Sequence, residues 1–341
     1  MNDMKKLIRY FAPVMTALVL APLFPISAVA QKGEAGFIGS WLEVPIGARS
    51  AAMGQAFVSL GEGGYGQLHN PAGMVGLKHR QFTTSYRSMN IDRKLTYAAV
   101  SFPLPEQAAF GLSWLYADYG NVDERANTGS LYNASGNKLG DIGQDEHQFG
   151  LTFAKRFSPR VSVGALVSYY QWKLDNITTN SVLFNAGFIL YIDNFLHDRE
   201  TMGEGLFTDI QVGAAIKSVG SAFIINTADF FGQSANLGST TSYEVPRKGV
   251  VGISGRTLDG SLLLATDVEI HETFGARFRI GGEYELTEQL LLRSGLNDGT
   301  FAAGAGFHFN LGKTPLLIDY AFQAGRVGEG SDHIISIDLS F

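Results

Sequence analysis

The sequence contains no cysteine, few charged residues and, after its first 30 residues, no long apolar run. The absence of cysteine from 341 residues excludes a disulfide framework and the thiol that anchors a bacterial lipoprotein. Charged residues make up only 17% of the chain, without a Lys/Arg cluster, so no nucleic-acid partner is expected. A spanning helix needs roughly 18 apolar residues, so any later crossing of a membrane must use strands.

Residues 1–30 have the layout of a secretory signal peptide. A basic segment beginning at Lys5 precedes an apolar stretch that ends at Ala30 with the small-x-small pattern, which predicts cleavage before Gln31. A retained membrane anchor is the alternative, but three prolines interrupt the stretch. Removing this segment takes away three of the 26 basic and one of the 32 acidic residues and leaves a net charge of −8. The chain is therefore expected to be exported.

From residue 80 onward, segments of about ten residues carry apolar side chains at every second position and are separated by turn residues, which is typical of a transmembrane barrel. We predict an all-β fold of fourteen antiparallel strands, an even number as in single-chain bacterial barrels. A soluble β-sandwich has a similar composition and is the alternative. The predicted strands are 80–88, 94–102, 107–116, 147–156, 161–172, 182–192, 208–217, 248–256, 262–270, 275–285, 290–296, 301–311, 315–323 and 333–341.

The connections between these strands alternate in length. With the N-terminus in the periplasm, the connections after the second, fourth, eighth, tenth and twelfth strands are short, as periplasmic turns are. The long polar segments 117–146 and 218–247 then lie on the extracellular side. Segment 193–207 is an exception, because it is long for a periplasmic turn and the sequence does not explain why.

The last predicted strand alternates regularly from Ile335 and ends the chain on the aromatic Phe341. A C-terminal strand that closes on Phe resembles the signal by which barrel-assembly machinery recognises outer-membrane proteins. We therefore predict that Phe341 faces lipid and is needed for assembly; an ordinary edge strand of a soluble protein is the alternative.

Residues 31–79 do not alternate, and their Gly and Pro content indicates tight backbone turns instead of a spanning strand. Two motifs stand out: P-x-G-A-R-x-x-x-M-G-x-A-F-V from Pro45 to Val58, and N-P-A-G from Asn70 to Gly73. With the signal peptide, the strand count and the terminal Phe, these motifs resemble the PorV/PorQ family of FadL-like outer-membrane barrels.

This resemblance implies that segment 31–79 folds into the lumen of the barrel (residues 80–341) as a plug or hatch. It also implies two different functions, since PorV and PorQ proteins act in the type IX secretion system and other FadL-like proteins pass hydrophobic small molecules. The plug residues that it singles out are Pro45, Gly47, Ala48, Arg49, Met53, Gly54, Asn70, Pro71, Ala72 and Gly73.

The sequence offers little support for catalysis or cofactor binding. Gly61 to Gly66 matches G-x-G-x-x-G, but Pro71 follows too closely for the helix that a dinucleotide site needs. The seven histidines are dispersed without an H-x-x-x-H pair, and no G-x-S-x-G elbow is present. The acidic residues of segment 117–146 lack the spacing of a calcium loop. We expect no enzyme activity, no cofactor and no metal.

Two functions remain open. The first is an interaction protein in the outer membrane, whose loops bind secretion-system components or exported proteins. Apolar residues in segment 218–247 favour it, since exposed apolar residues mark contact surfaces; they are Phe223, Ile224, Ile225, Phe230 and Phe231. The second is a transporter of a hydrophobic ligand, favoured by three small residues that would leave room inside the wall: Ala302, Gly304 and Gly306. An open porin is a weaker third option because of the plug.

Alternation also assigns the faces of strands 262–270, 275–285 and 290–296. Their apolar residues lie at even positions, so the odd positions face the lumen. Lipid would tolerate the charges found there poorly, at ~2–4 kcal/mol for each midplane Arg or Lys. Hairpin register predicts three opposed pairs that could favour the register and hold the plug: Asp267 with Arg279, Glu269 with Arg277, and Glu283 with Arg293. The alternative is that these are solvated charges that contribute little.

Overall fold

The computed structural model describes most of the chain after residue 38, and the predicted signal peptide and cleavage site lie outside the described residues. Within that part, no helix combines the length and the apolar character needed to cross a membrane. The described residues are 39–90, 92–125, 138–175, 177–194, 207–226, 240–258, 260–273, 275–312, 314–325 and 330–341.

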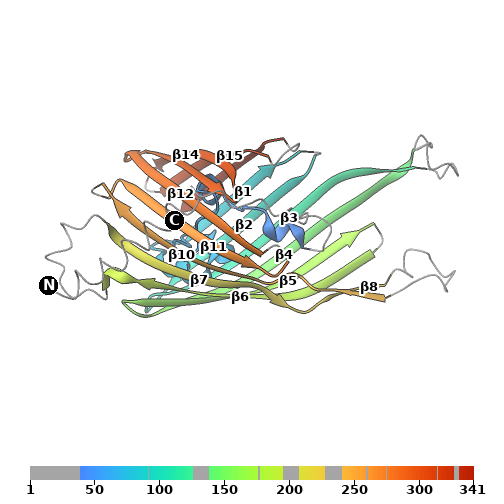
Figure 1. Ribbon diagram of the computed structural model, residues 1–341, viewed down its shortest axis with the longest axis horizontal. Helices are drawn as coiled ribbons and strands as arrows, with labels where there is room; N and C mark the ends of the chain where they lie inside the picture. Colours follow the sequence, from blue (N-terminus) through green and yellow to red (C-terminus); the bar gives the residue numbers. More distant parts are fainter. Residues whose placement is uncertain are drawn as a thin grey trace.

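Fourteen strands of the described chain pair antiparallel with their neighbours and close into a barrel (Figure 1), which confirms the predicted fold class. Each predicted strand range overlaps one of them. They are β1 Gln81–Ser88, β2 Lys94–Leu104, β3 Ala108–Arg125, β4 Lys138–Ser158, β5 Val161–Leu174, β6 Ile177–Tyr191, β7 Thr208–Gly220, β10 Lys248–Thr257, β11 Leu262–His271, β12 Gly275–Thr287, β13 Leu290–Asn297, β14 Thr300–Leu311, β15 Thr314–Gln323 and β16 Asp332–Ser340.

The wall is apolar outside, as β4 illustrates. Phe149, Leu151 and Phe153 are each 51% exposed, whereas Thr152 and Ala154 between and beside them are fully buried. Because successive side chains of a strand point to opposite faces, the exposed aromatic and aliphatic groups form the outer surface and the small or polar ones face the lumen. This pattern is the one that a lipid environment requires.

The predicted loop 117–146 is wrong in its boundaries, because β3 and β4 extend into it. The two strands remain paired as far as Arg125, opposite Lys138. This outer part of the hairpin carries polar side chains that do not follow the apolar alternation of the membrane wall. Backbone hydrogen bonds between two strands can continue beyond the point where apolar and polar side chains stop alternating, because a strand with water on both faces does not need an apolar face.

The predicted loop 218–247 also contains structure. A separate two-stranded sheet forms from β8 (Phe223–Asn226) and β9 (Thr240–Tyr243). Phe223, expected to be exposed, is fully buried, and its ring packs edge-on against Tyr170 with 5.6 Å between the centroids. Ile224 is 64% exposed, while Phe230 and Phe231 lie outside the described residues.

Residues 39–79 lie inside the barrel. They form four short helices: η2 (Ser40–Glu43), α2 (Ala48–Ala52), α3 (Gly66–His69) and η3 (Pro71–Gly76). Helix α2 contacts β13 to β16, whereas η3 contacts β3 to β6. One short segment can touch both sets of strands only from within the lumen, where Figure 1 shows it in blue. We call this segment, residues 39–79, the plug.

Candidate functional site

The plug is anchored to one side of the wall through Arg49. Its Nε and Nη2 donate to the two carboxylate oxygens of Glu283 at 2.7 and 2.9 Å, and its Nη1 donates to Glu62 at 2.8 Å. Glu283 also accepts from Arg293, which in turn pairs with Asp319 at 2.5 Å. The carboxylates beside Arg49 outweigh burial and raise the pKa of its guanidinium above the ordinary value. The arginine of the first motif therefore joins a buried charge network that is continuous with the wall.

The plug backbone rests directly on the wall at Met53 and Gly54. Gly54 has a φ of +60°, and a Cβ added there would lie 2.5 Å from the carbonyl oxygen of Leu296. The wall also presents glycines at this contact. A Cβ on Gly281 would lie 2.2 Å from the Met53 carbonyl oxygen, and a Cβ on Gly295 would lie 2.3 Å from the Met53 carbonyl carbon. Gly54 in the plug and the two wall glycines thus permit a close approach of the backbones that Cβ atoms would prevent.

A second anchor uses the backbone of the last two residues of the same motif. The amides of Phe57 and Val58 donate to one oxygen of Asp267 at 2.8 and 3.0 Å. A Cβ on Gly213 in β7 would lie 2.3 Å from the Val58 oxygen. Asp267 therefore holds the plug through two adjacent N–H groups, although the predicted partner for it was Arg279.

The N-P-A-G motif packs against the opposite wall. Asn70 is fully buried; its Nδ2 donates to the carbonyl oxygens of Val58 at 2.7 Å and Phe188 at 3.1 Å, and its Oδ1 accepts from the Ala72 amide at 3.1 Å. Asn70 thus caps η3 and links the plug to β6 at the same time. Pro71 lies against the wall, where a Cβ on Gly164 would be 2.4 Å from its carbonyl carbon.

The other singled-out plug residues are buried near these anchors. Ala48 donates its amide to Ser336 Oγ at 2.7 Å, and the Pro45 oxygen accepts from Arg87 at 3.3 Å. Gly47 has a φ of +89°, which favours glycine, and Gly73 crosses Gly61 too closely for a side chain. The structure thus places all ten predicted plug residues in the lumen: Pro45, Gly47, Ala48, Arg49, Met53, Gly54, Asn70, Pro71, Ala72 and Gly73.

The inward charges of β11, β12 and β13 lie opposite one another in the register Glu269–Arg277, Asp267–Arg279 and Glu283–Arg293. Their ion pairs differ in part from this register. Arg293 contacts Glu283 at 2.6 Å and Arg277 contacts Glu269 at 3.7 Å, but Arg279 pairs diagonally with Glu269 at 2.7 Å. All six side chains are at most 6% exposed, so they are not freely solvated wall charges.

A third anchor was not predicted from the sequence. Glu43 accepts from Lys248 Nζ at 2.8 Å, and Arg277 lies 3.7 Å from its other oxygen. Burial raises the pKa of Glu43, but Lys248 and His271 outweigh it and lower the pKa well below the ordinary value. Glu43 is therefore ionised in the plug. The sequence signal was Lys248 itself, an inward charge at the start of a predicted strand.

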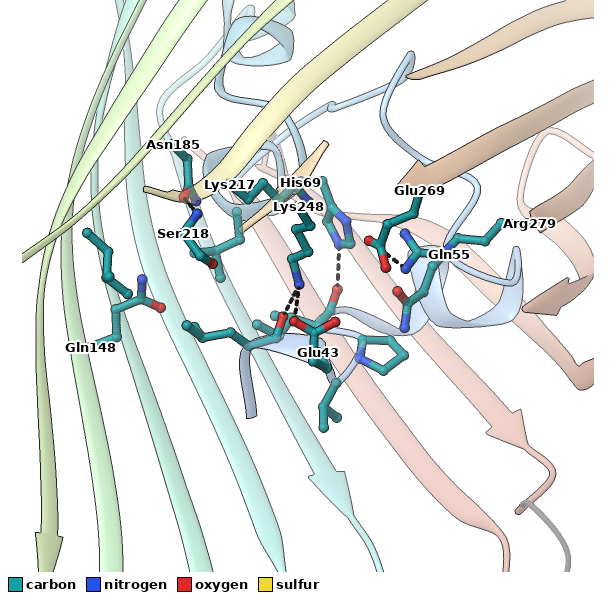
Figure 2. Close-up of a pocket in the computed structure, with 16 residues that line it drawn as sticks. Glu43, Gln55, His69, Gln148, Asn185, Lys217, Ser218, Lys248, Glu269 and Arg279 are labelled. Atoms are coloured by element: carbon teal, nitrogen blue, oxygen red, sulfur yellow. Dashed lines mark hydrogen bonds and ion pairs between the residues drawn. The ribbon is translucent and has the colours of Figure 1, made fainter. Parts of the chain in front are cut away.

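A cavity lies between the plug and the wall (Figure 2), with about 50 Å³ of space for water-sized occupants. Such a volume holds about four waters, since one needs ~10–15 Å³. It is smaller than the ~150 Å³ apolar cavity that binds benzene, and its lining mixes charged and amide groups with apolar side chains. Its charged and amide-bearing lining residues include Glu43, Gln55, Lys217, Lys248, Glu269 and Arg279.

His69 lies at the edge of this cavity on the plug. Its Nε2 is 3.1 Å from the Ile46 oxygen, and its ring packs edge-on against Phe57. Burial, together with the charge of Lys217, lowers the pKa of His69 to about 3, against the opposing effect of the Ile46 carbonyl. The imidazole is therefore neutral at ordinary pH. Among the described residues, no His, Asp or Glu cluster has the arrangement of a metal site.

The interpretation of Ala302, Gly304 and Gly306 as empty room is wrong. A Cβ on Gly304 would lie 2.7 Å from Ala52 of the plug, and one on Gly306 would lie 2.3 Å from Asp319. These small residues accommodate the plug and the charge network. Phe341 follows β16, is 57% exposed, and donates its amide to the Arg80 oxygen at 2.8 Å; its role in assembly stays a prediction.

No known family profile and no curated protein matches the sequence. Solved structures do resemble it. The toluene transporter TbuX of Ralstonia pickettii has 12% identity and a TM-score of 0.59 over 87% of this chain and 98% of its own. The toluene transporter TodX of Pseudomonas putida has 12% identity and a TM-score of 0.58 over 86% and 97%. A FadL homologue of Pseudomonas aeruginosa has 12% identity and a TM-score of 0.55 over 90% and 99%.

These likenesses concern the fold. The chain has the closed fourteen-stranded fold of FadL-like outer-membrane barrels. At 12% identity the likeness concerns the fold alone, and it does not assign a ligand or a subfamily.

Proposed function

We propose that this barrel transports hydrophobic small molecules across the outer membrane. The observation that carries the proposal is a lumen closed by a plug that is held only by non-covalent anchors. The Arg49, Glu43 and Asp267 contacts are ion pairs or hydrogen bonds, and the chain has no cysteine to fix them. Support comes from the neighbours of the same fold, two of which are toluene transporters.

Transport through this lumen would need the plug to move. The cavity beside the plug offers about 50 Å³, which is smaller than the ~150 Å³ cavity that holds benzene. Hydrophobic ligands would therefore bind only after the plug shifts away from part of the wall. Immobilising the plug should abolish transport without disturbing the barrel.

A disulfide lock tests this directly, because the cysteine-free chain makes introduced thiols unique. Ala48 and Ser336 suit the purpose, since the Ala48 amide already lies 2.7 Å from Ser336 Oγ. In a deletion strain carrying A48C/S336C, toluene uptake should fall under oxidising conditions and recover with a reductant, while A48C alone should respond to neither. Equal uptake by the deletion strain and the wild type would refute the transport function.

A second function, an interaction protein of PorV/PorQ type associated with type IX secretion, is favoured by the β3–β4 hairpin. These strands have 18 and 21 residues, whereas a membrane crossing needs about 9–11. β2 pairs with β3 only as far as Asp118, and β5 pairs with β4 only from Gln144. The outer part of the hairpin therefore stands clear of its neighbours, as Figure 1 shows at the upper right.

Shortening this hairpin separates the two functions. Replacing residues 119–143 with an Asn-Gly turn keeps every residue that pairs with β2 or β5 and leaves a loop long enough to close the hairpin between Asp118 and Asp145. If the hairpin binds secretion components or exported proteins, their recovery with tagged barrel from outer membranes should be lost while toluene uptake persists. Unchanged recovery, or no secretion component recovered by the full-length protein, would count against the second function.

A further inference from the structure

A buried carboxyl group joins the wall at the outer end of the plug. Glu146 of β4 points into the lumen and is only 2% exposed. One of its oxygens accepts from the Tyr119 hydroxyl of β3 at 2.5 Å, and the other accepts from the Tyr170 hydroxyl of β5. The apolar outer series of β4 begins at Phe149, so Glu146 lies on the extracellular side of the membrane-spanning part of this strand.

Tyr119 extends this link to the plug. Its hydroxyl lies 3.3 Å from Ser40 Oγ, and its ring packs edge-on against Trp41 with 4.8 Å between the centroids. Both partners are neutral residues of η2. A bulge fixes β3 at this point, since Tyr119 and Gly120 lie opposite the single Gln144 of β4. The buried carboxyl group is thus separated from the plug by one tyrosine.

Glu146 differs from the other buried glutamates of the lumen because no cation compensates it. Glu43, Glu269 and Glu283 each have a Lys or Arg nitrogen within 2.8 Å. Glu146 makes no ion pair with any residue that the structure describes, and its charged neighbour is another acid, Asp145. A buried ion without a counter-charge is costly. The protonated acid can still hydrogen-bond to both tyrosines, because it accepts on one oxygen and donates from the other.

The surroundings of Glu146 therefore favour its neutral form. Burial raises the pKa of Glu146 and the charge of Asp145 acts in the same direction, whereas the hydrogen bonds from Tyr119, Tyr170 and Gln144 oppose them only in part. Opening this contact would expose Glu146 to water, where its pKa is about 4.5. Because the closed contact holds the proton more tightly, its stability is fully present below about pH 4.5 and falls as the pH rises through the raised value.

We propose that Glu146 is a proton-operated latch on the outer end of the plug, closed when its carboxyl group is protonated and released when it is ionised. The anchors at Arg49, Asp267 and Asn70 do not involve this group, so the latch controls residues 39–44 and not the seating of the whole plug. As a regulator of transport the latch rests on the proposed function, but as a contact between the plug and the wall it does not.

Hydrogen exchange of the purified full-length barrel in detergent tests the latch. The amides of Leu42 and Val44 are bonded to the oxygens of Gly39 and Trp41 at the outer end of the plug. Their protection factors, corrected for the intrinsic pH dependence of exchange, should fall as the pH rises from about 4.5 to about 8.

Two variants assign this fall to one carboxyl group. Glu146→Gln stays neutral and should remove the fall, and because it differs from the wild type at one group, the effects of all other titrating residues cancel in the comparison. Asp141→Asn removes an exposed carboxylate from the outer part of the same strand and should show the wild-type fall.

Either of two results overturns the proposal: the same pH dependence in the wild type and Glu146→Gln, or a wild-type protection that rises with pH relative to that variant. Heat-modifiable migration on gels checks that each variant is a closed barrel. If Glu146→Gln fails this check, Tyr119→Phe takes its place, because it removes the hydroxyl between the acid and the plug and keeps the ring on Trp41; a wild-type fall in that variant refutes the latch. Exchange is measured without toluene, so failure of the latch and failure of transport give different results.

Discussion

Replacing Gly54 with alanine should release the plug from the wall. The added Cβ would meet the Leu296 oxygen at 2.5 Å and would sit on a residue with a φ of +60°. The left-handed backbone costs an L-residue about 1–2 kcal/mol, and forced overpacking costs about 1–3 kcal/mol more. A total near 3 kcal/mol corresponds to roughly a hundredfold increase in the population of the opened plug.

Hydrogen exchange measures this opening locally. The amides of Ala56 and Gly61 are bonded within the plug, to the oxygens of Met53 and Phe57, and should lose about two orders of magnitude of protection in Gly54→Ala, while strand amides keep theirs. Gly76→Ala is the matched control in the same plug, because a Cβ there has nothing within 4 Å. Equal protection in the two variants would show that the plug does not depend on its contact with β13.

Three further changes test other parts of the barrel. Arg49→Met removes two charge-assisted hydrogen bonds to Glu283. Because Arg49 is partly exposed and Glu283 keeps Arg293, we expect a coupling free energy of only about 2 kcal/mol in a double-mutant cycle with Glu283→Gln. Additive effects of the two substitutions would contradict a direct pair. The seated plug holds His69 neutral with a pKa of about 3, against 6.5 for the free imidazole. A released plug would therefore bind a proton on His69 that the seated plug excludes. We expect the plug to loosen as the pH falls below about 6.5. His69→Gln should flatten this pH dependence of exchange; an unchanged slope assigns it to another group. Deleting Phe341 should reduce the folded barrel seen by heat-modifiable migration, and a normal yield would exclude an assembly role.

The strands could be predicted because lipid imposes a simple rule on them. Strand β4 shows the rule, because its outward side chains are apolar and exposed whereas its inward side chain Thr152 is polar and buried. The outward residues are Phe149, Leu151 and Phe153. Beyond the membrane the rule ends, and for that reason the outer parts of β3 and β4 looked like a loop. Their backbone pairing continues to Arg125, opposite Lys138, but backbone hydrogen bonds leave no trace in side-chain periodicity.

The candidate site was predictable to a smaller degree. Inward charges on β11 to β13 followed from alternation, and their register followed from the hairpins. The choice of ion-pair partner did not, because Arg279 reaches across to Glu269 while Asp267 turns to the plug amides. Those contacts depend on where the plug lies, and strand periodicity carries no information about it. The irregularity of β7 at Lys217 and Ser218, two residues opposite the single Asn185 of β6, was likewise not predictable, since it depends on a one-residue mismatch between the two strands.

The plug and the inward charges form one interface. Inward carboxylates would be costly in an empty, narrow lumen unless they were paired or hydrogen-bonded, and the plug supplies what they lack: Arg49 to Glu283 and two backbone amides to Asp267. In return, the wall offers bare glycine backbone where Met53 and Gly54 approach. Removing the plug would therefore leave Asp267 without its two amide donors and Glu283 with Arg293 alone, and water would have to take the vacated positions. An opened state of this barrel must be hydrated along β11 and β12, so any hydrophobic passage has to avoid that side of the lumen.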